Sequence, residues 1–167
     1  MIEPSLDLYG EAAERVDAVL VDLLAQSRAR YALVVDRQGF VLLHQRAPWA
    51  PKPPSLDSLA TLVASNHSAN VAIAKLFGED GFRETVQQGD GVGTYVEALG
   101  DRALLLTVFD ETAPLGKVKL FTKRAVARIR EVLADVREAP PELTFGSAFS
   151  ADAGALLDDL FDDGTRA

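Results

Sequence analysis

Hydrophobic side chains recur at intervals of three and four residues along three stretches of the chain, which is the periodicity of amphipathic helices. The first stretch covers residues 10–27. The second covers residues 56–77 and is followed by Gly78, a residue typical of helix ends. The third follows Pro114, which a first helical turn tolerates, and continues to Val136. We therefore predict three helices.

Shorter apolar runs between the first two predicted helices indicate a β-hairpin. Residues 31–35 and 40–43 are rich in Leu and Val, and the four residues between them end in Gly39. Glycine supplies the backbone freedom that a tight return needs. The first run is apolar on both faces, so we expect protein to cover both sides of this strand.

Three further strands are predicted between the second and third helices. Residues 82–88 are mostly polar and are expected at the edge of a sheet. Residues 92–98 alternate between apolar and polar types, whereas residues 103–109 are nearly all apolar and are expected at the centre. The resulting order, α-β-β-α-β-β-β-α, predicts a single α/β sandwich with a five-stranded antiparallel sheet and helices on both faces.

Charge divides the chain into two parts. Residues 141–167 carry six acidic residues against Arg166, so most of the net charge of −8 lies in this segment. The consecutive prolines Pro140 and Pro141 mark the boundary between the two parts, and they stop a helix. We predict a compact domain over residues 1–138, a linker over residues 139–150 and an acidic amphipathic tail over residues 151–167. The apolar residues of this tail are Leu156, Leu157, Leu160 and Phe161.

Composition argues against several classes of function. The 167 residues include no cysteine and only two histidines, so neither thiolate chemistry nor a histidine-rich metal site is expected. An acidic chain repels phosphate backbones, so nucleic acid is not an expected partner. No run approaches the ~20 apolar residues that cross a bilayer, and the first residues lack the pattern of a secretory signal. We expect a cytoplasmic protein without a membrane span.

Catalytic motifs are also missing from the sequence. The glycine-rich loop that cradles nucleotide phosphates does not occur, and the glycines of residues 89–93 join two predicted strands in a turn. His44 and His67 have no serine, aspartate or second histidine at a spacing that suggests catalysis. The sequence therefore predicts no enzyme activity, cofactor or metal site.

The second predicted helix has one side that differs from an ordinary solvated face, which would be rich in Glu, Lys and Arg. The larger apolar residues define the expected core side: Leu59, Leu62, Val63, Ala69, Ile73 and Phe77. The opposite side is small and uncharged: Thr61, Ala64, Ser65, Ser68 and Ala72. Small side chains let another backbone approach closely at little entropic cost, which favours a docking face for a partner protein. The alternative is a helix simply rich in good or neutral helix formers.

Three other segments each allow two interpretations. The polar strand over residues 82–88 either discourages aggregation or pairs with its own copy about a two-fold axis. The third helix is basic, and its charges either form solvated flanks or supply an arginine to a partner's phosphate site. The tail over residues 151–167 either packs onto its own domain or binds a groove on a basic partner, and we favour the partner.

Several segments resemble the Roadblock family of GTPase-associated proteins. The element order and residues 31–42 (YALVVDRQGFVL) match the family in general. Residues 48–54 (PWAPKPP), 59–64 (LATLVA) and 108–120 (VFDETAPLGKVKL) are similar to a bacterial group within the family that regulates a small Ras-like GTPase in cell polarity and gliding motility. The resemblance extends to about residue 137, and in the tail only the acidic amphipathic character matches.

This resemblance implies a homodimer whose sheets join through residues 82–88, including Arg83, Thr85 and Gln87, with the two copies of the second helix side by side. Two copies of the chain would bind one GTPase on that face and stimulate GTP hydrolysis, and in some members nucleotide exchange. The group acts by repositioning the GTPase's own catalytic groups, and it clusters at a cell pole. The residues that the resemblance assigns to the GTPase contact are Thr61, Ala64, Ser65, Ser68, Ala72, Leu156, Leu157, Leu160 and Phe161.

Two other functions remain open at this point. The same fold could act as a scaffold that binds partners without changing GTP hydrolysis. It could also sense a small molecule, which would require polar groups that converge on a cavity. The predicted strands carry mostly Leu, Val and Ala, which argues against that sensor.

Overall fold

The computed structural model describes residues 8–138, so the predicted linker and tail, with Leu156, Leu157, Leu160 and Phe161, lie outside the described residues. The elements follow the predicted order. They are α1 (Gly10–Ser27), β1 (Tyr31–Asp36), β2 (Val41–Arg46), α2 (Leu56–Leu76), β3 (Glu84–Gln88), β4 (Val92–Leu99), β5 (Ala103–Asp110) and α3 (Leu115–Glu138).

The five strands form one antiparallel sheet in the order β2-β1-β5-β4-β3. The apolar strand β5 lies at the centre and the polar strand β3 at an edge, and both positions were predicted. All six residues of β1 are buried, which confirms that both of its sides are covered. The predicted α/β sandwich is therefore the observed fold.

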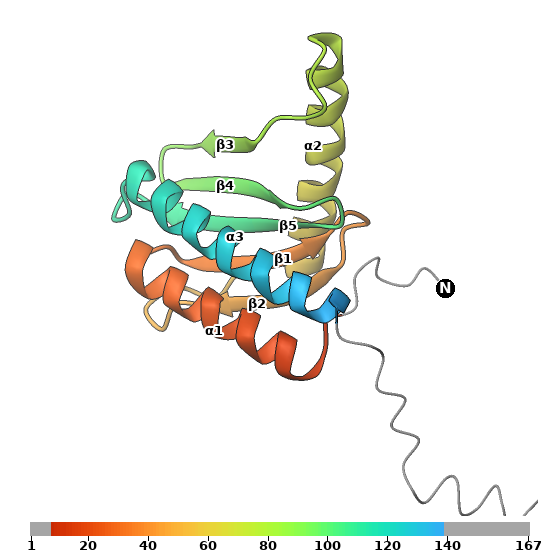
Figure 1. Ribbon diagram of the computed structural model, residues 1–167. Helices are drawn as coiled ribbons and strands as arrows, with labels where there is room; N and C mark the ends of the chain where they lie inside the picture. The colour runs from red at the N-terminus through yellow and green to blue at the C-terminus, as the bar shows by residue number, and fades with distance from the viewer. Residues whose placement is uncertain (1–7, 139–167) are drawn as a thin grey trace, which may run out of the picture. The chain divides into compact units, whose positions relative to one another are not determined.

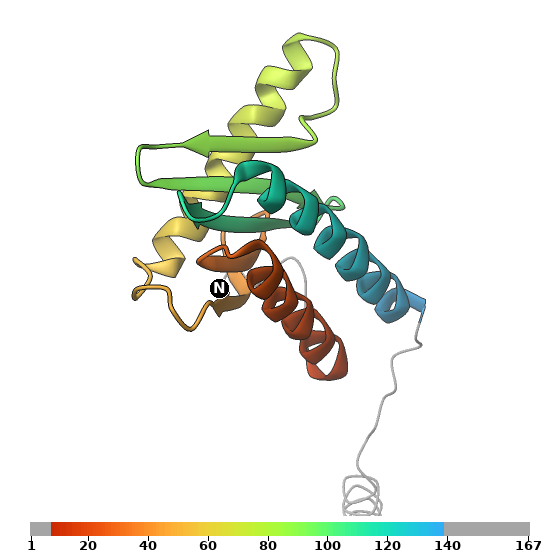
Figure 2. The ribbon, with the colours of Figure 1, turned by 90° about the vertical axis from the view of Figure 1, so that its left-hand side faces the viewer.

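The two faces of the sheet are covered by different numbers of helices. Figures 1 and 2 show α1 and α3 on one face and α2 alone on the other. The core under α1 and α3 includes the fully buried Tyr95, Leu20 and Ile129. The core under α2 is built mainly from the strands, with Leu33 and Leu106 fully buried.

Strand β3 is two residues shorter than predicted. After α2 ends, Gly78 adopts φ +78° and the Glu79 amide donates to the carbonyl of Ala74 at 3.1 Å, so the chain folds back along the helix. Pairing with β4 begins only at Glu84, opposite Glu97. Phe82 and Arg83 therefore belong to the connection between α2 and β3. The predicted strand over residues 40–43 is longer instead, because pairing with β1 continues to Arg46.

One close contact fixes how β4 lies against β5. Gly93 is paired with Phe109, whose ring covers the glycine. A Cβ atom at position 93 would lie only 2.4 Å from that ring, so no residue with a side chain fits without displacing it.

Candidate protein-interaction site

Helix α2 is held at both ends by local hydrogen bonds. The Ser58 amide donates to the side-chain oxygen of Ser55 at 3.3 Å, which caps the first turn. At the other end, the Gly78 amide donates to the carbonyl of Lys75 at 3.1 Å. Figure 1 shows that the helix crosses behind the sheet and that its C-terminal turns extend beyond edge strand β3.

Alanines form the buried part of α2. Ala60 and Ala74 are fully buried and Ala64 is 5% exposed. These small side chains let the helix approach its neighbours closely. At the β1–β2 turn, a Cβ atom on Gly39 would lie 2.9 Å from the Cα of Thr61, so a glycine is required there.

The predicted core side of α2 is largely wrong. Leu62 is 68% exposed, Ile73 45% and Phe77 77%, and Ala69 is also exposed. Leu59 and Val63 do pack against the core, at half-buried positions. The helix is rotated so that its alanines are its buried residues, with Ala60 in the core beneath it. Its last turns pass the sheet edge, where the domain offers no surface to cover large apolar side chains.

The predicted small face is exposed at four of its five positions. Thr61, Ser65, Ser68 and Ala72 face solvent, and the Ser68 hydroxyl donates to the carbonyl of Ala64 at 3.1 Å. Ala64 itself is buried in the domain's own core, so its expected place on the outer face was wrong. The outer surface of α2 thus combines an uncharged small strip with exposed apolar side chains.

Strand β3 borders this surface, and Thr85 and Gln87 lie on its α2 side. The Asn70 side chain of α2 donates to the Thr85 hydroxyl at 3.2 Å, and the Thr94 hydroxyl of β4 donates to Gln87 at 3.3 Å. Arg83 was expected on the strand, but it is exposed just before the strand begins. The side of β3 that faces away from β4 has no neighbouring strand within the described part of the chain.

A contact that the sequence did not predict joins α2 to two turns of the sheet. Arg37, in the β1–β2 turn, contacts the His67 imidazole of α2 through Nη1, and its Nη2 donates to the carbonyl of Gly100 at 2.9 Å. Burial lowers the pKa of His67, and the Arg37 guanidinium lowers it further. Burial also lowers the pKa of Arg37, although Asp101 opposes that shift. The neutral imidazole therefore accepts from the guanidinium and ties α2 to the sheet.

The basic residues of α3 lie on the opposite face of the sheet from α2 (Figure 2). Lys119 Nζ lies 2.5 Å and Lys123 Nζ 3.2 Å from the Glu84 carboxylate of β3. The Tyr95 hydroxyl donates to the same carboxylate at 2.7 Å. Lys119 and then Tyr95 contribute most to lowering the pKa of Glu84 to about 2. Burial and the two nearby carboxylates, Glu84 and Glu97, raise the pKa of Tyr95.

The residues that the sequence analysis considered for metal binding or catalysis can be placed in the described part of the chain. Over residues 8–138, His, Cys, Asp and Glu form no group of three that could hold a metal ion. His44 is exposed on β2, and His67 is used in the contact with Arg37. No helix of this part of the chain is long and apolar enough to span a membrane.

Comparisons with known proteins agree on one family. The Roadblock/LC7 domain matches residues 15–109. The chain is similar to the gliding protein mglB from Thermus thermophilus, with 56% identity, a TM-score of 0.78, and coverage of 80% of this chain and 99% of that one. It is similar to a structure described as MglB with a tetrameric arrangement, with 57% identity, a TM-score of 0.78, and coverage of 80% and 98%. For Myxococcus xanthus MglB the identity is 28%, the TM-score 0.66, and the coverage 72% and 95%. A comparison with curated protein sequences gives no match.

Proposed function

The chain belongs to the Roadblock/LC7 domain family, as its sequence motifs predicted, and on this premise we propose that it is a homodimeric activator of GTP hydrolysis by a small Ras-like GTPase of the MglA type. Similarity to MglB proteins supports a regulatory role. The observation that carries the proposal is the outer surface of α2, where an uncharged strip and exposed large apolar residues lie beside an open sheet edge.

Exposed apolar residues beside the β3 edge support the homodimer. Leu76, the last residue of α2, is 84% exposed, and Phe77, which follows it, is 77% exposed. The C-terminal turns of α2 extend beyond β3 (Figure 1). Surfaces of this kind mark protein interfaces, and a two-fold axis beside β3 would cover the same surface in both copies. The two sheets would join through Thr85 and Gln87 of each β3, and the two α2 helices would lie side by side.

The strip formed by Thr61, Ser65, Ser68 and Ala72 supports a GTPase contact. Its side chains are short and uncharged, so a partner backbone could approach α2 without displacing long or solvated groups. Two such strips side by side in the dimer would bind one GTPase. Ala64 is buried within its own domain, so any contribution that it makes to this contact is indirect. The tail residues Leu156, Leu157, Leu160 and Phe161 remain proposed contacts of the same GTPase.

The residue types on α2 support activation by positioning. The helix contains no arginine, and Lys75 in its last turn is its only lysine. A binding face without arginine accelerates hydrolysis if it selects the GTPase conformation in which the catalytic groups and the attacking water are aligned. Catalysis then remains with the GTPase, and this chain acts as a regulator of its conformation.

Phosphate release tests the proposal directly. The full chain is mixed with the Ras-like GTPase of the same genome, and multiple-turnover GTP hydrolysis is compared with and without it. We expect acceleration by the native chain and loss of acceleration with Ala72→Arg or Ser65→Arg, because an added guanidinium blocks the strip. Ala18→Arg, at an exposed position of α1 on the other face, is the matched control and should accelerate hydrolysis normally.

Each of the other possible results leads to a different conclusion about the chain. Binding without acceleration would identify the chain as a scaffold. Equal acceleration by Ala72→Arg and the native chain would show that the GTPase contacts a different surface. Release of labelled GDP, measured in the same samples, determines whether nucleotide exchange accompanies hydrolysis.

A further inference from the structure

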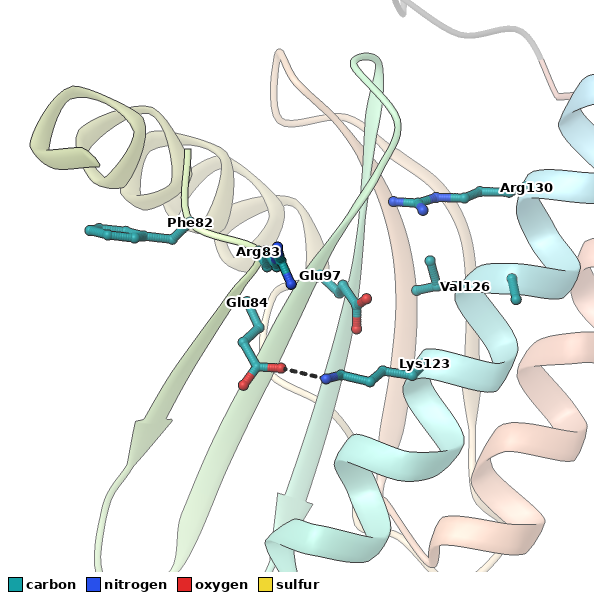
Figure 3. A pocket seen from close by; sticks show the side chains of 8 residues that line it. Phe82, Arg83, Glu84, Glu97, Lys123, Val126 and Arg130 are labelled. Atoms are coloured by element: carbon teal, nitrogen blue, oxygen red, sulfur yellow. Dashed lines mark ion pairs between the residues drawn. The ribbon is translucent and has the colours of Figure 1, made fainter. Parts of the chain in front are cut away.

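A second surface lies on the α3 side of the sheet. There a cleft of about 610 Å³ opens between the start of β3 and the middle of α3. Figure 3 shows Lys123 and Arg130 reaching from α3 toward the strands, where Glu84 and Glu97 lie. Arg83 lies at the start of β3, and Val126 and Ala127 form an apolar wall on α3.

Positive charge exceeds negative charge in this cleft. Glu84 is already neutralised by Lys123 and by Lys119 beside it. Within residues 8–138, Arg83 and Arg130 form no ion pair, and the Arg130 guanidinium donates only to the carbonyl of Ala98, at 2.9 Å. An excess of cations is notable on a chain with a net charge of −8. It favours a ligand that carries carboxylates or phosphates.

The remaining groups of the cleft distinguish between these two ligand chemistries. The half-buried Glu97 lies inside the cleft without a cationic partner among the described residues, and its Oε2 lies 3.0 Å from the Tyr95 hydroxyl. This carboxylate repels any anionic group, so it favours a ligand that also offers hydrogen-bond donors, which the N–H groups of a peptide supply and a fully ionised polyphosphate does not. The wall of Val126 and Ala127 can contact an apolar side chain. Acceptors, cations and an apolar wall together match an amphipathic peptide.

We propose that the cleft between β3 and α3 binds an acidic amphipathic peptide segment of a partner protein, with its carboxylates on Arg83 and Arg130 and an apolar side chain against Val126 and Ala127. The site lies on the face opposite α2, so it can be filled while α2 holds another protein (Figure 2). This proposal does not depend on the proposed GTPase contact, because the cleft lies away from the outer surface of α2. Arg83 is the one cleft arginine that also belongs to the segment expected at the dimer edge.

Fluorescence anisotropy of the full chain tests the site. The probe is a fluorescein-labelled peptide of about 12 residues with Leu at helical spacing and Glu at the other positions. We expect Arg83→Ala and Arg130→Ala each to weaken binding about three- to tenfold, because each removes one charged contact. Arg128→Ala removes a cation of α3 that pairs with Asp22 outside the cleft, and it should leave the affinity unchanged.

Three further measurements decide the ligand chemistry. Raising NaCl from about 50 mM to about 500 mM should weaken peptide binding, because salt screens exposed charges. A peptide with Lys in place of Glu should not bind. The proposal is overturned if the Lys peptide binds equally, if neither cleft arginine matters, or if inorganic polyphosphate binds the cleft more tightly than the Glu peptide.

GTP hydrolysis separates this proposal from the proposed function. Arg130→Ala should weaken the peptide and leave acceleration of the GTPase unchanged. Ala72→Arg should abolish acceleration of the GTPase and leave peptide binding unchanged. Loss of GTPase activation in Arg130→Ala, with peptide affinity unchanged, would contradict the proposal that the cleft binds the peptide and the α2 face binds the GTPase.

Discussion

The two faces of the sheet are covered in different ways. On one face, α1 and α3 bury large side chains such as Tyr95, Leu20 and Ile129. On the other, α2 is seated through alanines and leaves Leu62 and Leu76 in solvent. Burial of large apolar side chains is the main source of stability, so the first face holds the domain together. The second face is covered by one helix that buries small side chains and leaves several large apolar residues exposed.

The largest expected effect contrasts one leucine from each face. Leu20→Ala removes a fully buried side chain under α1 and should lower the free energy of unfolding by about 3 kcal/mol. Leu62→Ala shortens an exposed side chain of α2 and should alter the free energy of unfolding by less than about 0.5 kcal/mol. Urea unfolding at low protein concentration measures both. A large loss in Leu62→Ala would show that the Leu62 side chain is buried in the folded chain.

The next effect concerns the close approach of α2 to the β1–β2 turn. Gly39→Ala places a Cβ atom against the Thr61 backbone and adds a side chain at φ +95°, which together should cost about 2 kcal/mol. Gly100→Ala, at φ +67° with open space around it, isolates the backbone cost and should lose about 1 kcal/mol. If the two variants unfold alike, the approach of α2 is looser than the structure indicates.

A smaller effect is expected from the ion pairs of Glu84 on the α3 side. Because Lys119 and Lys123 are partly exposed, Glu84→Gln should cost only about 1 kcal/mol near neutral pH. The lysines and Tyr95 hold the pKa of Glu84 at about 2, below its ordinary value. This contribution is therefore complete above about pH 5 and is lost as the pH falls toward 2. Unfolding curves of Glu84→Gln and the native chain should converge in acid, whereas Glu14→Gln, on exposed α1, should match the native chain throughout.

The smallest effect is expected from His67 on the α2 side. Its lowered pKa means that the unfolded chain takes up a proton more readily, so stability falls as the pH drops below the ordinary histidine value of about 6.5. His67→Gln should flatten this dependence in unfolding measured between about pH 7 and pH 5. His44→Gln, which removes the exposed histidine of β2, should retain it. A native-like slope in His67→Gln would assign the dependence to another group.

Periodicity predicted the elements well because most of them are amphipathic or fully buried. The nearly all apolar residues of β5 indicated the centre of the sheet, the apolar residues of β1 indicated cover on both sides, and the polar residues of β3 marked an edge. These inferences depend on local sequence alone. They were confirmed because the burial of a strand and its place in the sheet follow from its own apolar and polar residues.

The orientation of α2 could not be predicted in the same way. Sequence reasoning placed Leu62 and Ile73 inside because large apolar residues are usually buried. That rule assumes that the domain covers the whole helix, whereas the last turns of α2 pass the sheet edge. The Arg37–His67 contact and the cleft beside α3 join residues far apart in the chain, and no local pattern indicates them.

The fit of the Phe109 ring over Gly93 has a consequence for the proposed dimer. Sliding β4 by one position would bring a residue with a side chain beneath the ring, so only one alignment of β4 on β5 is available. Strand β3 reaches the rest of the sheet only through β4. The position of β3 relative to the rest of the sheet, where a second chain would pair, thus depends on the absence of a side chain at Gly93. A side chain at position 93 would displace the Phe109 ring or shift β4 on β5, and in the proposed dimer it would move β3 although position 93 lies outside the proposed contact surface.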